Sequence, residues 1–161
     1  SKEASSPAGA MAPVGNKAQA AMNSAMNAAN ITDALCANCG LCCDGSLFHD
    51  VELADADEAD GLEALRLEIE DGDDDGKDAE FLIQPCRALK GTRCSVYAHR
   101  PECCRTFECG LLRDAKAGDI SVEAALEVVA EARRRIDGVQ RGRAGMGKSD
   151  LEEFLCVRFL T

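Results

Sequence analysis

Ten cysteines in 161 residues constrain this chain more than any other feature of its sequence. Nine of them fall in two short stretches, residues 36–43 and 86–109, and only Cys156 lies apart. The first stretch reads Cys36-Ala-Asn-Cys39-Gly-Leu-Cys42-Cys43. Thiols at two-residue intervals can converge on one point, which is how proteins commonly build a metal site. The cysteines therefore predict a bound metal centre, and they say much less about its use.

A secreted disulfide framework is the alternative use for so many cysteines. Such frameworks usually space their cysteines through a short chain. Here the cysteines are paired at C-x-x-C distance and two pairs are adjacent, and adjacent cysteines rarely bridge without strain. The pattern favours a reduced, cytoplasmic metal protein. No apolar run approaches the roughly 20 residues that span a bilayer, so no membrane partner is expected.

The formal net charge is −11, which disfavours nucleic acid as a partner and suggests an acidic surface for a protein partner. The charge is unevenly spread, because residues 86–113 carry six cations and two carboxylates. Guanidinium groups near thiolates lower the thiol pKa and stabilise an anionic cluster. This basic stretch is either charge compensation for the metal centre or chance surface charge.

The pattern predicts a small single α+β domain with low strand content, loop-rich around a cysteine–metal centre and completed by packed helices. Residues 1–30 are expected to form a partly disordered tail rich in Ala, Ser and Asn, and residues 31–137 the metal-binding domain. A Gly/Arg linker at residues 138–148 and a short C-terminal helix at residues 149–161 are expected to follow. The clearest helix is expected over residues 121–136, with Gly138 as its stop.

Shorter elements are expected around the cysteines. Residues 36–43 are predicted to form a loop, because four ligands that converge on one metal are not expected to keep a regular pattern of backbone hydrogen bonds. Asp55 and Glu58 resemble a capping box, so a helix is expected to begin there and to continue its apolar face through Leu65 and Ile69. Strand-like runs lie at residues 81–83 and 94–97.

The triplet Cys36-x-x-Cys39-x-x-Cys42 has the spacing of the first three ligands of a bacterial ferredoxin cluster. The fourth ferredoxin ligand, a Cys-Pro three residues on, is missing, so further ligands must come from the second stretch. Zinc is the rival, because C-x-x-C pairs with a distant second set also describe zinc sites. The spacing favours an iron–sulfur centre, such as [4Fe–4S], or iron over Zn²⁺. His49 and His99 could replace a cysteine as ligand of either metal, but as single histidines they are favoured to have a surface or hydrogen-bonded role.

Together these motifs resemble the CxxCxxCC cysteine-cluster family, which is described as a zinc- or iron-chelating domain. The resemblance covers about residues 31–113 and includes Gln84-Pro85-Cys86 and Cys94-x-x-Tyr97-x-x-Arg100-Pro101-x-x-Cys104-Arg105-x-Phe107-x-Cys109. The family pattern implies eight metal ligands: Cys36, Cys39, Cys42, Cys43, Cys86, Cys94, Cys104 and Cys109. Cys103 and Cys156 fall outside it, and we expect a free thiol and a small buried apolar residue, respectively.

Eight thiols fit either two four-ligand sites or one larger polynuclear cluster. Three other residues of the motif are expected to contact the bound centre. Arg100, with Pro101, would set a turn that aims Cys104, and Arg105 would pair with the anionic centre. Tyr97 would donate a hydrogen bond to a sulfur, or else pack in the core with its hydroxyl satisfied.

The expected function is metal-centre binding by a cytoplasmic protein, and three uses of the centre compete. A metal-binding or chaperone protein would show exposed ligands. A redox or group-transfer enzyme would need an open coordination position, and a structural module would bury all eight thiols. We rank these uses in that order. No catalytic base, oxyanion loop or phosphate loop is evident, which argues against a conventional hydrolase or nucleotide enzyme.

Overall fold

The computed structural model describes residues 16–161 and has the predicted α+β fold. The predicted disorder of the N-terminal tail falls partly on residues 1–15, which lie outside the described residues. The elements, in chain order, are α1 (Asn16–Cys39), β1 (Asp50–Glu52), α2 (Ala56–Ala64), β2 (Ile69–Asp74), β3 (Lys77–Ile83), β4 (Leu89–Lys90), β5 (Arg93–Cys94), the 3-10 turn η1 (Tyr97–His99), α3 (Glu102–Thr106), α4 (Gly110–Ala117), α5 (Val122–Gln140), α6 (Lys148–Leu155) and the π-helical turn η2 (Cys156–Leu160).

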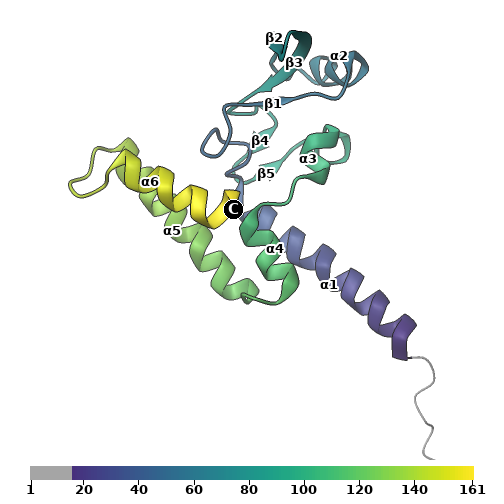
Figure 1. Ribbon diagram of the computed structural model, residues 1–161, viewed down its shortest axis with the longest axis vertical. Coiled ribbons are helices and arrows are strands. Elements are labelled where there is room, and N and C mark those ends of the chain that lie inside the picture. Colours follow the sequence, from purple (N-terminus) through teal and green to yellow (C-terminus); the bar gives the residue numbers. More distant parts are fainter. Residues whose placement is uncertain (1–15) are drawn as a thin grey trace, which may run out of the picture.

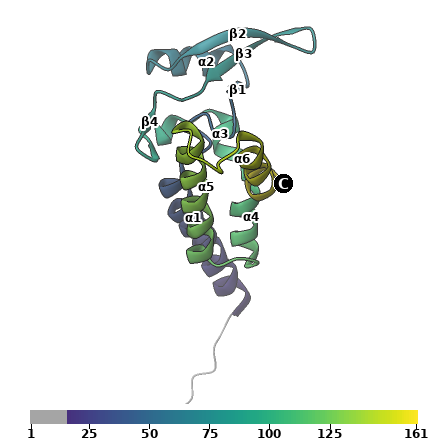
Figure 2. The same ribbon diagram turned by 90° about the vertical axis from the view of Figure 1, so that its left-hand side faces the viewer.

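Two hydrophobic cores divide the molecule into a helical half and a β half. In the helical half α1, α4, α5 and α6 pack together, and in the β half α2 lies beside the sheet of β1, β2 and β3 (Figures 1 and 2). The β4–β5 hairpin and α3 lie between the two halves. The buried residues of the helical core are Leu35, Leu41, Leu111, Leu112, Ala115, Ala125, Val129, Ala132, Leu155 and Phe159. Those of the β core are Leu53, Ala59, Leu62, Leu67, Leu82, Cys86 and Ala88.

The β half is an antiparallel sheet in the order β1-β3-β2, and α2 covers part of it. Leu82 of β3 pairs with Val51 on one side and Ile69 on the other, and it is buried. The predicted start of α2 is confirmed, because the Asp55 carboxylate accepts a hydrogen bond from the Glu58 N–H at 2.9 Å. The predicted continuation of this helix is wrong: α2 ends at Ala64 and Ile69 begins a strand.

The first cysteines lie on a helix, which corrects the predicted loop over residues 36–43. The Ala-rich segment has high helix propensity, and α1 continues to Cys39 before Gly40 ends it in the left-handed conformation with φ +71°. Residues three apart on a helix share one face, so Cys36 and Cys39 lie together without leaving the helix. A regular helix and convergent thiols are therefore compatible here.

Two other expectations need correction. The strand predicted over residues 94–97 is limited to Cys94, because Tyr97 opens a 3-10 turn that leads to the extended residue before Pro101. Helix α5 also runs through Gly138, its predicted stop, to Gln140. A Cβ at Gly138 would lie 2.9 Å from Met146 Cγ, so this glycine permits close packing instead of ending the helix.

Within residues 16–161, none of the helices has both the length and the apolar composition that crossing a bilayer requires.

Gly40, directly after α1, lies close to Thr92 between β4 and β5, and this approach supports a stability prediction. A Cβ there would lie 3.2 Å from Thr92 Cα, while the Thr92 hydroxyl donates to the Ala37 carbonyl at 2.5 Å. Gly118 is also left-handed, with φ +84°, but a Cβ there would meet nothing within 4 Å. We expect Gly118→Ala to cost about 1–2 kcal/mol, from backbone conformation alone, and Gly40→Ala to cost more. Denaturant unfolding of both variants measures this difference, and equal losses would contradict the close approach.

Candidate metal centre

All ten cysteines are free thiols, and the eight predicted ligands come from six places in the chain. Cys36 and Cys39 lie in the last turn of α1, and Cys42 and Cys43 lie in the turn that follows it. The other four lie on separate elements: Cys86 follows β3, Cys94 is in β5, Cys104 is in α3, and Cys109 caps the N-terminus of α4. The fold thus gathers ligands that are up to 73 residues apart in the sequence.

Electrostatic coupling defines a first group of four neighbouring thiols. Burial raises the pKa of the Cys42 thiol strongly, and the next causes are repulsion from charges on Cys39 and Cys109, followed by the adjacent Cys43 and then Cys36. Burial also raises the pKa of Cys39 to about 12, with Cys109 and Cys36 adding to the shift. We call this set the first thiol group: Cys36, Cys39, Cys42 and Cys109.

A second group is coupled in the same way around the β core. Burial raises the pKa of Cys43 to about 11, and charges on Cys86 and Cys94 raise it further. The pKa of Cys104 is raised by a hydrogen bond with Cys103, then by burial, and then by charges that include Cys43 and Cys86. The second thiol group is Cys43, Cys86, Cys94 and Cys104.

The two groups follow the two hydrophobic cores. Cys39 and Cys109 pack against the helical core, whereas Cys86 belongs to the β core and is 8% exposed. Cys43 and Cys94 pack against the β core. The adjacent residues Cys42 and Cys43 thus belong to different groups, and the chain passes from the helical half to the β half in the segment that follows them, where Leu47 still packs against the helical core.

Among residues 16–161, no three Cys, His, Asp or Glu side chains are placed closely enough to bind one metal ion as they stand. The members of each group are electrostatic neighbours whose sulfurs do not yet meet at a point. Turning a cysteine side chain from one staggered rotamer to the next moves its sulfur by roughly 3 Å. Closing either group on a metal therefore requires rotation of cysteine side chains, and the electrostatic coupling identifies the thiols involved.

Main-chain N–H groups are directed at sulfurs in both groups. The Leu112 N–H, in the first turn of α4, donates to Cys109 Sγ at 3.4 Å. Hydrogen bonds from the main chain at Leu41 and at Ala88 oppose the effect of burial on the pKa of Cys39 and Cys86, respectively. Such donors stabilise thiolate and tune metal-bound sulfur. The donor set thus suits a thiolate-bound metal in each group.

Cations surround the first group more closely than the second. Arg100 and Lys116 oppose the effect of burial on the pKa of Cys36, Arg113 does so for Cys109, and Arg133 for Cys39. Arg100 also acts on Cys43 and so reaches both groups. Charge compensation, predicted for residues 86–113, thus also involves Lys116 and Arg133, which lie beyond that stretch.

The three motif residues expected to contact the centre occupy different positions. Arg100 is half-buried; its Nε donates to the Tyr97 carbonyl at 3.1 Å and its Nη1 to the Cys104 carbonyl at 3.3 Å. The Tyr97 ring lies under the guanidinium of Arg100 at 3.7 Å, and the Tyr97 hydroxyl is 3.5 Å from the Asp33 carboxylate. Arg105 is exposed on α3. Arg100 is thus held in place between the groups.

The remaining candidates lie at the edge of the site or away from it. His49 and His99 are both exposed. Cys103 is half-buried, and its hydrogen bond with Cys104 lowers its pKa. Cys156 is exposed at the end of α6, so the prediction that it is a small buried residue is wrong. Its neighbours Leu155 and Phe159 occupy the core instead.

A family model named CxxCxxCC, with the description "Putative zinc- or iron-chelating domain", matches residues 35–124. The match covers more than half of the chain and includes all eight predicted ligands, which confirms the resemblance drawn from the motifs. No curated protein and no solved structure shows significant similarity to the chain. The family description supports metal binding and leaves the choice between zinc and iron open.

The raised thiol pKa values predict that the metal-free protein loses stability in alkali. Unfolded thiols ionise at their ordinary pKa of 9.0, whereas folded Cys43 and Cys39 hold their protons to about 11 and 12. Between pH 9 and pH 12 the unfolded chain therefore binds fewer protons, and stability falls as pH rises. Thermal unfolding across this range measures the decline.

A variant with Cys39→Ala and Cys43→Ala is the control for other groups that titrate in the same range. It should show a shallower decline than the unsubstituted protein. Parallel curves for the two proteins would contradict the assignment of the alkaline transition to these thiols.

Proposed function

The chain belongs to the CxxCxxCC family, and from this premise we propose that it is a metal-binding protein with two centres, each held by four thiolates. The first thiol group would hold one centre and the second thiol group the other. The observation that carries the proposal is that the charges acting on the eight motif thiols arrange them in two sets of four, which are linked through the adjacent Cys42 and Cys43. A single polynuclear cluster would need all eight sulfurs to share one site, whereas the sulfurs follow two different cores.

We propose an iron–sulfur cluster, of the [4Fe–4S] type, for the first thiol group. Three of its ligands are spaced at two-residue intervals and the fourth, Cys109, is remote, which is a pattern typical of such clusters. The neighbouring cations also suit a centre that carries net negative charge. A cluster of this kind supplies one-electron redox chemistry, while the chain's own residues hold it, exclude water from it and set its surrounding charge.

We propose a closed, structural role for the second thiol group. Its ligands come from four separate segments, and Cys86 is part of a hydrophobic core. The Cys86 N–H donates to the Cys43 carbonyl at 2.7 Å, so two of these segments are already joined through the main chain. For this group zinc is the alternative to an iron centre, because four dispersed thiolates form a closed tetrahedral zinc site. Zinc in both groups is the alternative for the whole protein.

The accessibility of the first thiol group supports metal-centre binding as the role, ahead of catalysis or a purely structural role. Cys36 is an exposed residue at the rim of this group. An exposed ligand permits exchange of metal or of electrons with a partner, whereas a purely structural centre is closed. A protein partner for the acidic surface remains part of the proposal, and residues 50–80 carry fifteen carboxylates and two cations.

Anaerobic purification with metal and sulfide analysis tests the nature of the centres. We expect a brown protein with a broad absorption band near ~400 nm, iron and acid-labile sulfide. A colourless protein with about two zinc ions per chain would overturn the iron–sulfur assignment and keep the two-centre proposal. A reduced protein that takes up neither iron nor zinc would overturn the proposed function.

Single substitutions test the division into two groups. Cys39→Ser should remove the metal of the first centre only, and Cys94→Ser that of the second only, because each removes one of four ligands. Cys103→Ser and Cys156→Ser are matched controls that keep all eight motif thiols, and their metal content should equal that of the unsubstituted protein. Complete metal loss from either ligand variant would indicate one shared cluster. Losses in the controls would contradict the ligand set.

A further inference from the structure

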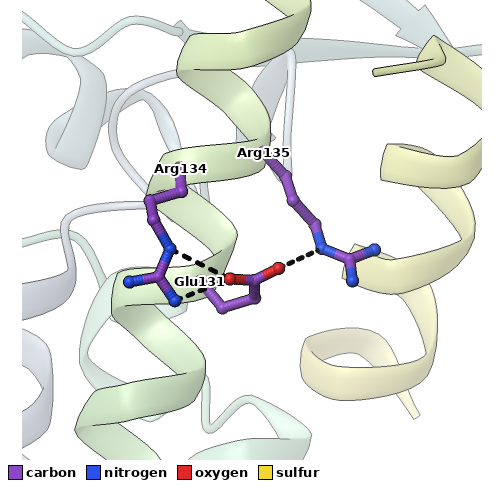
Figure 3. Close-up of polar contacts among 3 residues, drawn as sticks. All are labelled: Glu131, Arg134 and Arg135. Carbon is purple, nitrogen blue, oxygen red and sulfur yellow. Dashed lines mark hydrogen bonds and ion pairs between the residues drawn. The ribbon is translucent and has the colours of Figure 1, made fainter. Parts of the chain in front are cut away.

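Helix α5 carries three consecutive arginines, and only two of them have acidic partners on the same helix. Arg134 and Arg135 both donate to the Glu131 carboxylate, at 2.6 and 2.8 Å (Figure 3). Arg133 lies four residues after the buried Val129 and next to the buried Ala132, so helical periodicity places it on the face of α5 that packs in the core. An arginine on that face needs a separate explanation.

The side chain of Arg133 reaches the first cysteine motif. Its Nη2 would lie 3.4 Å from a Cβ placed on Gly40, the residue directly after Cys39. Its Nε is buried and has no hydrogen-bond partner within the described part of the chain. The guanidinium therefore lies against the end of α1, with an unused donor, beside a thiol of the first group.

Arg133 as a whole is half-buried, but its buried Nε–H has lost its water and has no acceptor among the described residues, which is costly. Cys39 directly precedes Gly40, which the guanidinium approaches, and its sulfur is a candidate acceptor by chemistry. A thiolate at this position would give the guanidinium the partner that a neutral thiol does not.

We propose that Arg133 is a positioning residue of the first metal centre, where its guanidinium donates to metal-bound sulfur beside Gly40 and offsets the negative charge of the four thiolates. The inference rests on the proposed function. It also extends the site beyond the family match, which ends at residue 124. The left-handed Gly40 leaves the space that the guanidinium occupies.

The test measures the affinity for Zn²⁺, used as a redox-inert probe, in the full chain after reduction and removal of metal. Competition with a chromophoric chelator gives two binding steps, one for each thiol group. Arg133→Met removes the charge and the donors while it keeps a long, helix-forming side chain. Arg133→Lys keeps the charge alone. Arg134→Met is the matched control, because it removes the same charge one residue away on the exposed side of α5.

We expect Arg133→Met to weaken one of the two zinc-binding steps by about 10–100-fold, as is typical for residues that hydrogen-bond metal ligands. Arg133→Lys should lie between this variant and the unsubstituted protein. Arg134→Met should stay within about twofold of it, since exposed ion pairs contribute little. Equal affinities for Arg133→Met and Arg134→Met would overturn the inference, as would equal weakening of both steps.

A second measurement separates this role from simple packing. Thermal unfolding of the metal-free protein should show Arg133→Met to be at least as stable as the unsubstituted protein, because the substitution removes a buried Nε–H that has no acceptor among the described residues. A metal-free variant that is less stable or fails to fold would assign Arg133 a packing role and overturn the inference. If neither metal-free protein is folded, the affinities decide. An unsubstituted protein that binds no zinc and no iron refutes the proposed function itself.

Discussion

The peptide bond between Cys42 and Cys43 is the constraint on which the rest of the molecule depends. One residue belongs to thiols that border the helical core, and the next to thiols that border the β core. The chain has no Trp, one Tyr and five Phe, so each core is built mainly from small aliphatic side chains. A structural zinc site contributes about 10–16 kcal/mol in apparent binding free energy, comparable with the whole net stability of a domain, about 5–15 kcal/mol. Metal in both thiol groups would therefore tie segments from both halves to one short turn, and would contribute on the scale of the entire fold.

Acidic and basic residues are distributed unequally between the β half and the helical half. The carboxylates gather in residues 50–80, the part of the chain that forms β1, α2, β2 and most of β3. Three of the cations that act on the first thiol group come from the helical half, Lys116 and Arg113 from α4 and Arg133 from α5, and Arg100 comes from the turn before α3, between the halves. Opposite charge placed near thiolates lowers the free energy of an anionic centre. The carboxylates of residues 50–80 thus lie in the β half, while the helical half supplies most of the cations that act on the first thiol group.

The sequence predicted the thiols and the fold class, because cysteine spacing and helical periodicity are local properties of a chain. It did not predict which thiols are neighbours, since that depends on how the β4–β5 hairpin docks on α1, a contact between Thr92 and Ala37 across 55 residues. The loop expected at residues 36–43 was wrong because the i, i+3 spacing of Cys36 and Cys39 serves a helix as well as a loop. Arg133 was missed as a site residue. The sequence did contain an indication of its role, because helical spacing places Arg133 on the same apolar face of the predicted helix as Ala125, Val129 and Ala132.

The folding unit around the first thiol group includes helix α5, most of which lies beyond the family match. The family match ends at residue 124, in the first turn of α5, yet half of the ten buried residues of the helical core lie beyond that point: Ala125, Val129, Ala132, Leu155 and Phe159. A chain cut there would leave the apolar faces of α1 and α4 in water, where each exposed Leu or Val side chain costs about 1.5–3 kcal/mol. Cys36, Cys39 and Cys109 belong to those same two helices. The eight predicted ligands are therefore contained within the family match, but half of the helical core that supports the first thiol group is not.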